Sequence, residues 1–310
     1  MAFNIHEEIR RNKIKSNIVI FGFFLFVGVI GAFAGMVYGG YTQGNLFDLS
    51  SIIFSVVMAS VISIIYILIF LSAGDKMILN ATGAVEADRK TYPHLYHTTE
   101  ALSIAAGLKV PPKCYVIDDN SLNAYATGFK PEKSYVVVTK GLLNKLNRQE
   151  IEGVLAHEIA HIKNQDIKVM LIAAGLVGAT VLLADIIFRM FIFSSSGGGK
   201  KDGRVMAFVF VFWLILIIVS PIVARMIKMA ISRRREYLAD ATGAKLTRYP
   251  EGLASALERI KNDGKNLKTA NKATAHLFIS NPFKKKMGIS NLFSTHPPID
   301  ERIKILRGQK

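Results

Sequence analysis

Two long apolar runs stand near the start of the chain, separated by a short, mostly polar connection. The first covers residues 18–38 without a charged side chain, and the second covers residues 52–71. Each is close to the roughly 20 apolar residues that an α-helix needs to cross a bilayer. Because the first run is longer than a typical signal-peptide core and a second run follows it, we predict an uncleaved hairpin of two transmembrane helices.

Two further apolar runs, residues 169–193 and 205–227, lie in the second half of the chain. The first of them contains Asp185 and Arg189, which stand four residues apart. On a helix these two side chains can pair with each other, or they can lie near the far interface, where an arginine reaches the headgroups. We predict that the two runs form a second transmembrane hairpin.

The remaining residues have the pattern of a soluble α+β domain. Apolar positions at helical spacing between capping signals predict helices, and short runs rich in β-branched and aromatic residues predict strands. The predicted strands are 114–117, 123–127 and 135–139; the predicted helices are 91–107, one opened by a capping box at Asn147 and Glu150, 240–247, 250–263 and 300–306.

Composition and charge add an orientation to this pattern. The apolar fraction is 51% and the formal net charge is +16, much of it flanking the apolar runs. Basic residues in that position favour the cytoplasmic side, so we predict a cytoplasmic N-terminus and a cytoplasmic domain after Leu71. No aromatic-plus-basic pattern accompanies the charge, so nucleic acid is not an expected partner. The single cysteine, Cys114, excludes an intrachain disulfide and a cysteine-rich zinc site.

A His-Glu-x-x-His motif occupies residues 157–161 within a mostly apolar stretch. On a helix, His157 and His161 project from one face, so both imidazoles can bind one metal ion. Glu158 is rotated by about 100° from His157 and can border the metal without binding it. Zinc accepts such ligands and lowers the pKa of a bound water. The alternative, that these residues merely decorate a helix, is disfavoured because burying them without a cation would be costly.

Two histidines leave a catalytic zinc site one protein ligand short. No histidine follows His161 at the short spacing of the metzincins, so that class is excluded. Glu236 follows the fourth apolar run, with Asp240 four residues later on the same helical face. We predict Glu236 as the third ligand and Asp240 as the acceptor of a ring N–H from a ligand histidine. Such a pair alone is common on solvated helices, so the prediction depends on its combination with the histidine motif.

The chain resembles the HtpX-type heat-shock membrane metalloproteases, which are relatives of the CAAX prenyl proteases. The segments that carry the resemblance, in an order that covers nearly the whole chain, are 121–128, 154–166, 232–244 and 294–298. The resemblance implies a zinc endopeptidase of the bacterial or archaeal plasma membrane that faces the cytoplasm and degrades damaged membrane proteins. It also implies that Glu236 is a zinc ligand and that Asn123 and Ala124 line the substrate cleft, where an edge strand can pair with an extended peptide.

Three residues keep two interpretations each. His296, which precedes two prolines, can stabilise an oxyanion in the cleft or serve as a structural loop residue. Asp166 can orient His161, or it can simply lie near the end of the helix. Asn123 can bind the backbone of a peptide, or it can be an ordinary turn residue.

Together these features predict an integral membrane, mainly α-helical protein with four transmembrane helices and a zincin-like α+β catalytic domain with a small β-sheet. The predicted parts are the N-terminal hairpin 1–74, the second hairpin 167–231, and a catalytic domain divided between 75–166 and 232–310. The expected cofactor is one Zn²⁺ per chain, and the expected partners are the lipid bilayer and membrane-protein or unfolded polypeptide substrates. The sequence does not fix the oligomeric state. A processing protease for lipidated or small peptides and a non-enzymatic zinc-containing scaffold are the alternatives.

Overall fold

In the computed structural model, the chain forms two compact units. One consists of Met1–Lys13, Ala73–Ile172 and Lys228–Lys310, and the other of Ile14–Ser72 and Ala173–Ile227. The residues that the structure describes are 5–164, 166–167, 171, 175, 185, 189, 233–269, 274, 277–280, 282 and 297–308.

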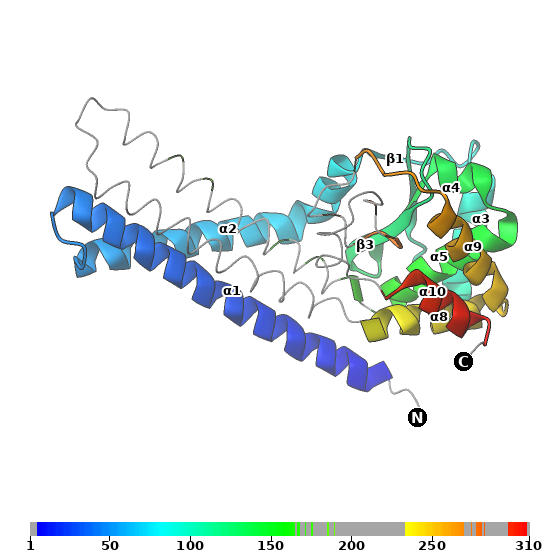
Figure 1. Ribbon diagram of the computed structural model, residues 1–310, viewed down its shortest axis with the longest axis horizontal. Helices are drawn as coiled ribbons and strands as arrows, with labels where there is room; N and C mark the ends of the chain where they lie inside the picture. Colours follow the sequence, from blue (N-terminus) through cyan, green and yellow to red (C-terminus); the bar gives the residue numbers. More distant parts are fainter. Residues whose placement is uncertain are drawn as a thin grey trace. The chain divides into compact units, whose positions relative to one another are not determined.

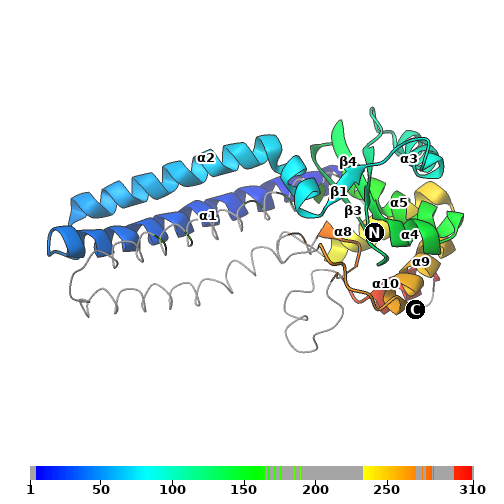
Figure 2. The same ribbon diagram turned by 90° about the horizontal axis from the view of Figure 1, so that it is seen from above.

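The second unit contains most of a hairpin of two long helices, α1 (Ile5–Thr42) and α2 (Leu49–Ala81), whose residues 5–13 and 73–81 belong to the first unit. The two helices lie next to each other near the turn that joins them (Figures 1 and 2). Phe21–Gly40 and the whole of α2 are long and apolar enough to cross a membrane. A Cβ atom on Gly35 would lie 2.5 Å from the Cα of Ile52, so the missing side chain lets the two backbones approach. Small residues at helix contacts serve this purpose in membrane proteins.

The second predicted hairpin falls almost entirely outside the described residues, so its spanning of the membrane remains a prediction. Asp185 and Arg189 are described, and they pair with each other, with 2.7 Å between Nε of Arg189 and Oδ2 of Asp185. This is the first of the two interpretations that their spacing allowed.

The first unit contains a four-stranded sheet of order β1-β2-β4-β3. Its strands are β1 (Ala84–Glu86), β2 (Lys113–Ile117), β3 (Ala124–Lys130) and β4 (Lys133–Thr139). β2 and β4 are parallel, and the other neighbouring pairs are antiparallel. The three predicted strands are therefore present, while the three-residue β1 was too short to predict. β3 forms an edge of the sheet, as the resemblance implied for the strand that carries Asn123 and Ala124, although Asn123 itself lies just before the strand.

Helices surround α5, which carries the histidine motif. The helices of this unit are α3 (Pro93–Ala106), α4 (Lys140–Lys145), α5 (Arg148–Lys163), α8 (Arg233–Thr247), α9 (Pro250–Asn262) and α10 (Ile299–Leu306). The predicted capping box of Asn147 and Glu150 opens α5. α5 packs against β3 and β4, and also against α3, α8 and α9. A Cβ atom on Gly243 would lie 3.0 Å from the backbone nitrogen of His157, so this glycine lets α8 approach the motif closely.

Candidate metal centre

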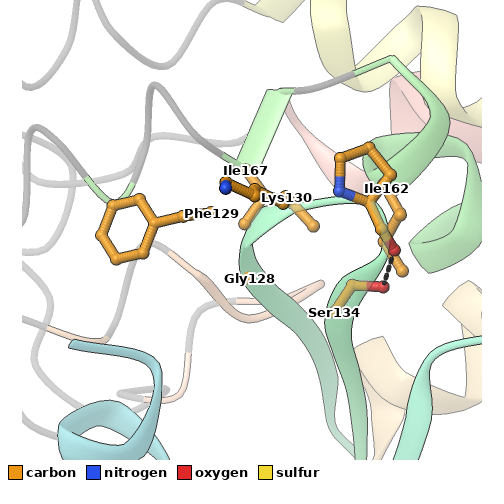
Figure 3. A pocket seen from close by; sticks show the side chains of 7 residues that line it. Gly128, Phe129, Lys130, Ser134, Ile162 and Ile167 are labelled. Atoms are coloured by element: carbon orange, nitrogen blue, oxygen red, sulfur yellow. Dashed lines mark hydrogen bonds between the residues drawn. The ribbon is translucent and has the colours of Figure 1, made fainter. Parts of the chain in front are cut away.

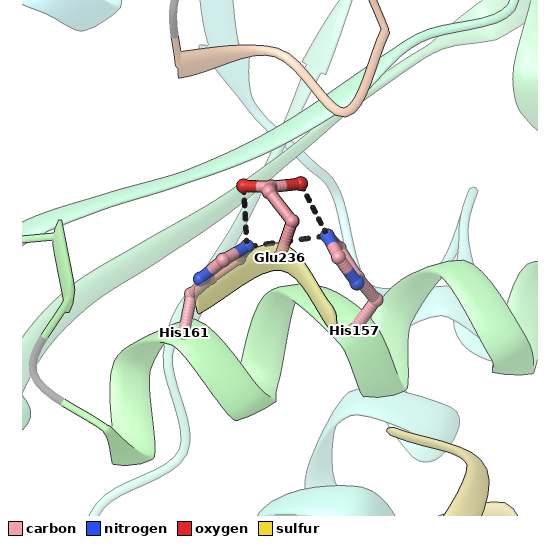
Figure 4. A group of neighbouring side chains, drawn as sticks. All are labelled: His157, His161 and Glu236. Carbon is pink, nitrogen blue, oxygen red and sulfur yellow. Dashed lines mark hydrogen bonds and ion pairs between the residues drawn. The ribbon is translucent and has the colours of Figure 1, made fainter. Parts of the chain in front are cut away.

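Three buried side chains from two helices converge on one point. His157 and His161 project from α5, and the carboxylate of Glu236 reaches them from α8 (Figure 4). The two Nε2 atoms lie 3.2 Å apart, and the Glu236 oxygens lie 3.6 Å from Nε2 of His161 and 3.8 Å from Nε2 of His157. Ligands of a tetrahedral zinc ion, each about 2.0–2.1 Å from the metal, lie about 3.3 Å from one another. The spacing and chemistry of this group therefore fit a zinc ion.

Each histidine is held by a carboxylate on its other ring nitrogen. Nδ1 of His157 lies 2.9 Å from Oδ1 of Asp240, and Nδ1 of His161 lies 3.3 Å from Oδ2 of Asp166. Such pairs fix the ring orientation and direct Nε2 towards a metal. Asp240 thus lies where it was predicted, and Asp166 lies where its orienting interpretation requires.

Burial and neighbouring carboxylates shift the pKa values of the two histidines in opposite directions. Burial lowers the pKa of His157 to about 4, which keeps its ring neutral. Burial also opposes charge on His161, but its hydrogen bond to Asp166 and the nearby carboxylate of Glu236 prevail and raise its pKa to about 9. Since a histidine must be neutral to bind a metal, a cation would replace the proton of His161. The carboxylates around His161 therefore stabilise one positive charge at this site, either a proton on the ring or a bound metal ion.

Glu158 borders this group without belonging to it. It is 2% exposed, and burial is the main cause that raises its pKa to about 7. The backbone of Ala126 on β3 donates a hydrogen bond to its carboxylate. Its Oε1 atom is buried and has no hydrogen-bond partner among the described residues. A carboxyl group with a pKa near neutrality is suited to accept a proton and return it.

Arg302, on α10, completes the site and was not predicted. Its guanidinium donates to both oxygens of Asp240, at 2.8 Å from Nε and 2.7 Å from Nη2. Nη1 lies 3.6 Å from Oε2 of Glu236, and Nη2 lies 3.4 Å from both ring nitrogens of His157. The side chain is 1% exposed. No local signal marks it, because α10 is short and rich in charged residues that look solvated.

The predicted substrate-binding residues lie at the start of the edge strand. Asn123 is 3% exposed, and its side-chain oxygen accepts a hydrogen bond of 3.1 Å from the backbone of Ala124. Its Nδ2 atom donates to the carbonyl oxygen of Ser280, 3.2 Å away. His296 lies outside the described residues, so its role remains a prediction.

A small pocket lies at the opposite end of β3 from Asn123 (Figure 3). Its lining residues are Gly128, Phe129, Lys130, Pro131, Ser134, Ile162 and Ile167. Ser134 donates a hydrogen bond of 2.8 Å to the carbonyl oxygen of Pro131 across the strand turn. None of the metal-centre residues lines this pocket, so it is separate from the site on α5 and α8.

The chain also resembles known proteins. Residues 89–310 match the family model described as Peptidase family M48. A "Protease HtpX homolog" of Listeria monocytogenes is 40% identical over 312 residues, which cover 97% of this chain and 99% of the relative. One of Dictyoglomus turgidum is 43% identical over 305 residues, which cover 98% and 95%. The solved structure of S. mikatae Ste24p aligns with a TM-score of 0.46 and 22% identity, over 97% of this chain and 66% of that one. The chain belongs to peptidase family M48 and is a membrane metalloprotease.

Proposed function

We propose that the chain is a zinc-dependent endopeptidase that cleaves unfolded or damaged membrane proteins on the cytoplasmic side of the plasma membrane. The observation that carries the proposal is the group formed by His157, His161 and Glu236, with Glu158 beside it. Its spacing suits one tetrahedral ion, and its buried carboxylates favour a cation.

His157, His161 and Glu236 would hold the ion, with the two rings kept in place by Asp240 and Asp166. Bound there, a zinc ion would supply a water molecule of lowered pKa and would polarise the scissile carbonyl. Glu158 then accepts one proton of the attacking water as the oxygen bonds to the carbonyl carbon. It returns that proton to the amide nitrogen as the C–N bond breaks, so the products are a carboxylic acid and an amine.

Substrate binding would follow from the position of β3. An edge strand offers backbone donors and acceptors to an extended peptide, and this mode depends mainly on the peptide backbone. Such binding accepts unfolded polypeptides of many sequences and does not select one narrow cleavage sequence. The two long apolar helices support a substrate that is itself at or near the membrane.

The proposed chemistry is tested with the purified full-length chain in detergent. Glu158→Gln is expected to bind one zinc ion per chain in metal analysis while losing cleavage of β-casein, because only the proton acceptor is removed. Glu236→Gln is expected to lose zinc as well. Normal casein cleavage by Glu158→Gln would refute the mechanism, and undiminished zinc content in Glu236→Gln would refute the ligand assignment.

The proposed orientation has a separate test. Lys109 is exposed, and Cys114 is the single cysteine, so a Lys109→Cys chain in a Cys114→Ser background carries one accessible thiol. A membrane-impermeant maleimide is expected to label this thiol in inverted membrane vesicles and not in intact cells. Labelling in intact cells would place the catalytic domain outside the cytoplasm.

A further inference from the structure

The edge of β3 is already paired with another part of the chain. We call Leu277–Ser280 the edge segment. The backbone N–H of Ile279 donates to the carbonyl oxygen of Ala124 at 2.9 Å. The side-chain amide of Asn123 donates to the carbonyl oxygen of Ser280 at 3.2 Å. Residues 278–280 are bends rather than a strand, so β3 and Asn123 hold the edge segment by one backbone and one side-chain hydrogen bond, at the edge where an added peptide would pair.

The pairing uses the edge of β3 that faces the metal centre. The carbonyl oxygen of Asn123 accepts from the N–H of Thr139 at the end of β4, with 3.0 Å between the atoms. Backbone groups of successive residues point to opposite sides of a strand, so Ala124 and Ala126 direct theirs away from β4. The N–H of Ala126 accordingly reaches Glu158. A peptide laid along β3 towards Glu158 would need the Ala124 carbonyl that Ile279 occupies.

The opposite side of the edge segment is bound to Arg302. The carbonyl oxygen of Ile279 accepts from Nη1 of Arg302 at 3.2 Å. The same nitrogen lies 3.6 Å from Oε2 of Glu236. One guanidinium group therefore separates the edge segment from the carboxylate of the metal centre, and the segment lies next to the position of bond cleavage.

Apolar side chains anchor the edge segment. Phe278 is 0% exposed, Ile279 2% and Leu277 4%. The ring of Phe278 meets the ring of Tyr125 on β3 edge to face, with centroids 4.9 Å apart. Because the edge segment is covalently part of the chain, a free peptide competes with a tethered one, which has a fixed effective concentration at β3.

We propose that the edge segment is an internal pseudo-substrate, which must leave β3 before a polypeptide can pair there. This proposal rests on the proposed function, because only an enzyme that binds extended peptides along β3 has this edge to protect. Displacement requires a polypeptide that offers an extended backbone together with apolar side chains for the positions of Phe278 and Ile279. Unfolded membrane proteins have that chemistry, whereas folded soluble proteins do not expose it.

Hydrogen exchange on the intact, zinc-loaded Glu158→Gln chain tests the displacement without cleavage. The amides of residues 277–280 are expected to be protected in the free chain, since the N–H of Ile279 is bonded to β3. Excess β-casein is expected to speed their exchange at least about threefold, while the amides of α5 keep their protection. Casein binding with unchanged protection of residues 277–280 would overturn the proposal and leave the proposed function intact.

Weakening the anchor tests the consequence for catalysis. Phe278→Ala is expected to lower KM for casein about fivefold with little change in kcat, because the lost contact corresponds to one aromatic pair. Leu257→Ala is the matched control, since Leu257 is likewise 0% exposed but lies on α9 and not on β3 or the edge segment. A raised or unchanged KM in a folded Phe278→Ala chain, or an equal fall in the control, would overturn the proposal.

The two failures are distinguishable. If neither the Glu158→Gln chain nor its Phe278→Ala derivative binds casein, and the unsubstituted chain does not cleave it, the proposed function fails and the pseudo-substrate with it. In the other case, cleavage is present and depends on Glu158, but Phe278→Ala does not lower KM and casein leaves the protection of residues 277–280 unchanged. The proposed function then stands, and the edge segment is a permanent part of the domain.

Discussion

Replacing Arg302 by glutamine is expected to weaken both the fold and the metal centre. The substitution removes two short hydrogen bonds to Asp240, at 2.7 and 2.8 Å, and leaves that buried carboxylate with only the His157 ring as its described side-chain partner. Removing one partner of a buried ion pair lowers the free energy of unfolding by about 3–5 kcal/mol. Loss of a group that supports a metal ligand lowers metal affinity about 10–100-fold. Stability falls because the carboxylate of Asp240 stays buried without its main partner. Metal affinity falls because Asp240 orients Nε2 of His157.

The measurement uses the Glu158→Gln background to prevent self-cleavage. Zinc affinity is determined by competition with a chelating dye, and stability by thermal unfolding. Arg307→Gln is the matched control, because Arg307 caps the C-terminal end of the same helix and pairs with Glu251 and Glu258 at the surface, where an ion pair contributes about 0–1 kcal/mol. If Arg302→Gln folded and bound zinc as tightly as the control, Arg302 would have no part in positioning the site.

Three further predictions concern stability and reactivity. Burial raises the pKa of Cys114 to about 11, and the reactive form is the thiolate, so iodoacetamide should alkylate the folded chain slowly at pH 8 and faster as the pH rises towards 11; rapid labelling at pH 8 would contradict this. Gly35→Val should lower the unfolding temperature in detergent, because the added side chain meets α2, whereas Gly28→Val, with open space around it, should not. Asn147→Ala should destabilise the chain by about 1 kcal/mol in thermal unfolding through loss of the α5 cap, and an unchanged midpoint would refute that role.

Features determined over a few residues were predictable from the sequence. The spacing of His157 and His161 sets their common face through helix geometry alone, and the capping box at Asn147 and Glu150 likewise depends on neighbouring residues. Glu236 could be predicted from the sequence because a zinc site with two histidines requires a third ligand and few acidic residues stand at a suitable place in the chain. These inferences need no knowledge of how distant segments pack.

Features determined by distant contacts were not predictable. Arg302 reaches Asp240 across 62 positions of sequence, and within the amphipathic α10 it looks like any solvated arginine. The pairing of Ile279 with Ala124 joins residues that lie still farther apart in the sequence, and an apolar segment carries no signal of the strand that it will cover. Only the folded arrangement identifies these partners, because each contact depends on where several other elements lie.

The arrangement of the site also connects its metal affinity with assembly of the domain. α5 supplies two histidines, α8 supplies Glu236 and Asp240, and α10 supplies Arg302, so the proposed ligands are in place only when three separate helices have packed together. A ligand that binds only the assembled form stabilises it in proportion to the logarithm of the ligand concentration over its Kd. Zinc bound here would therefore hold together two stretches of chain that a long apolar insertion separates. With these proposed ligands, the enzyme would become active only after the segments before and after the insertion have met.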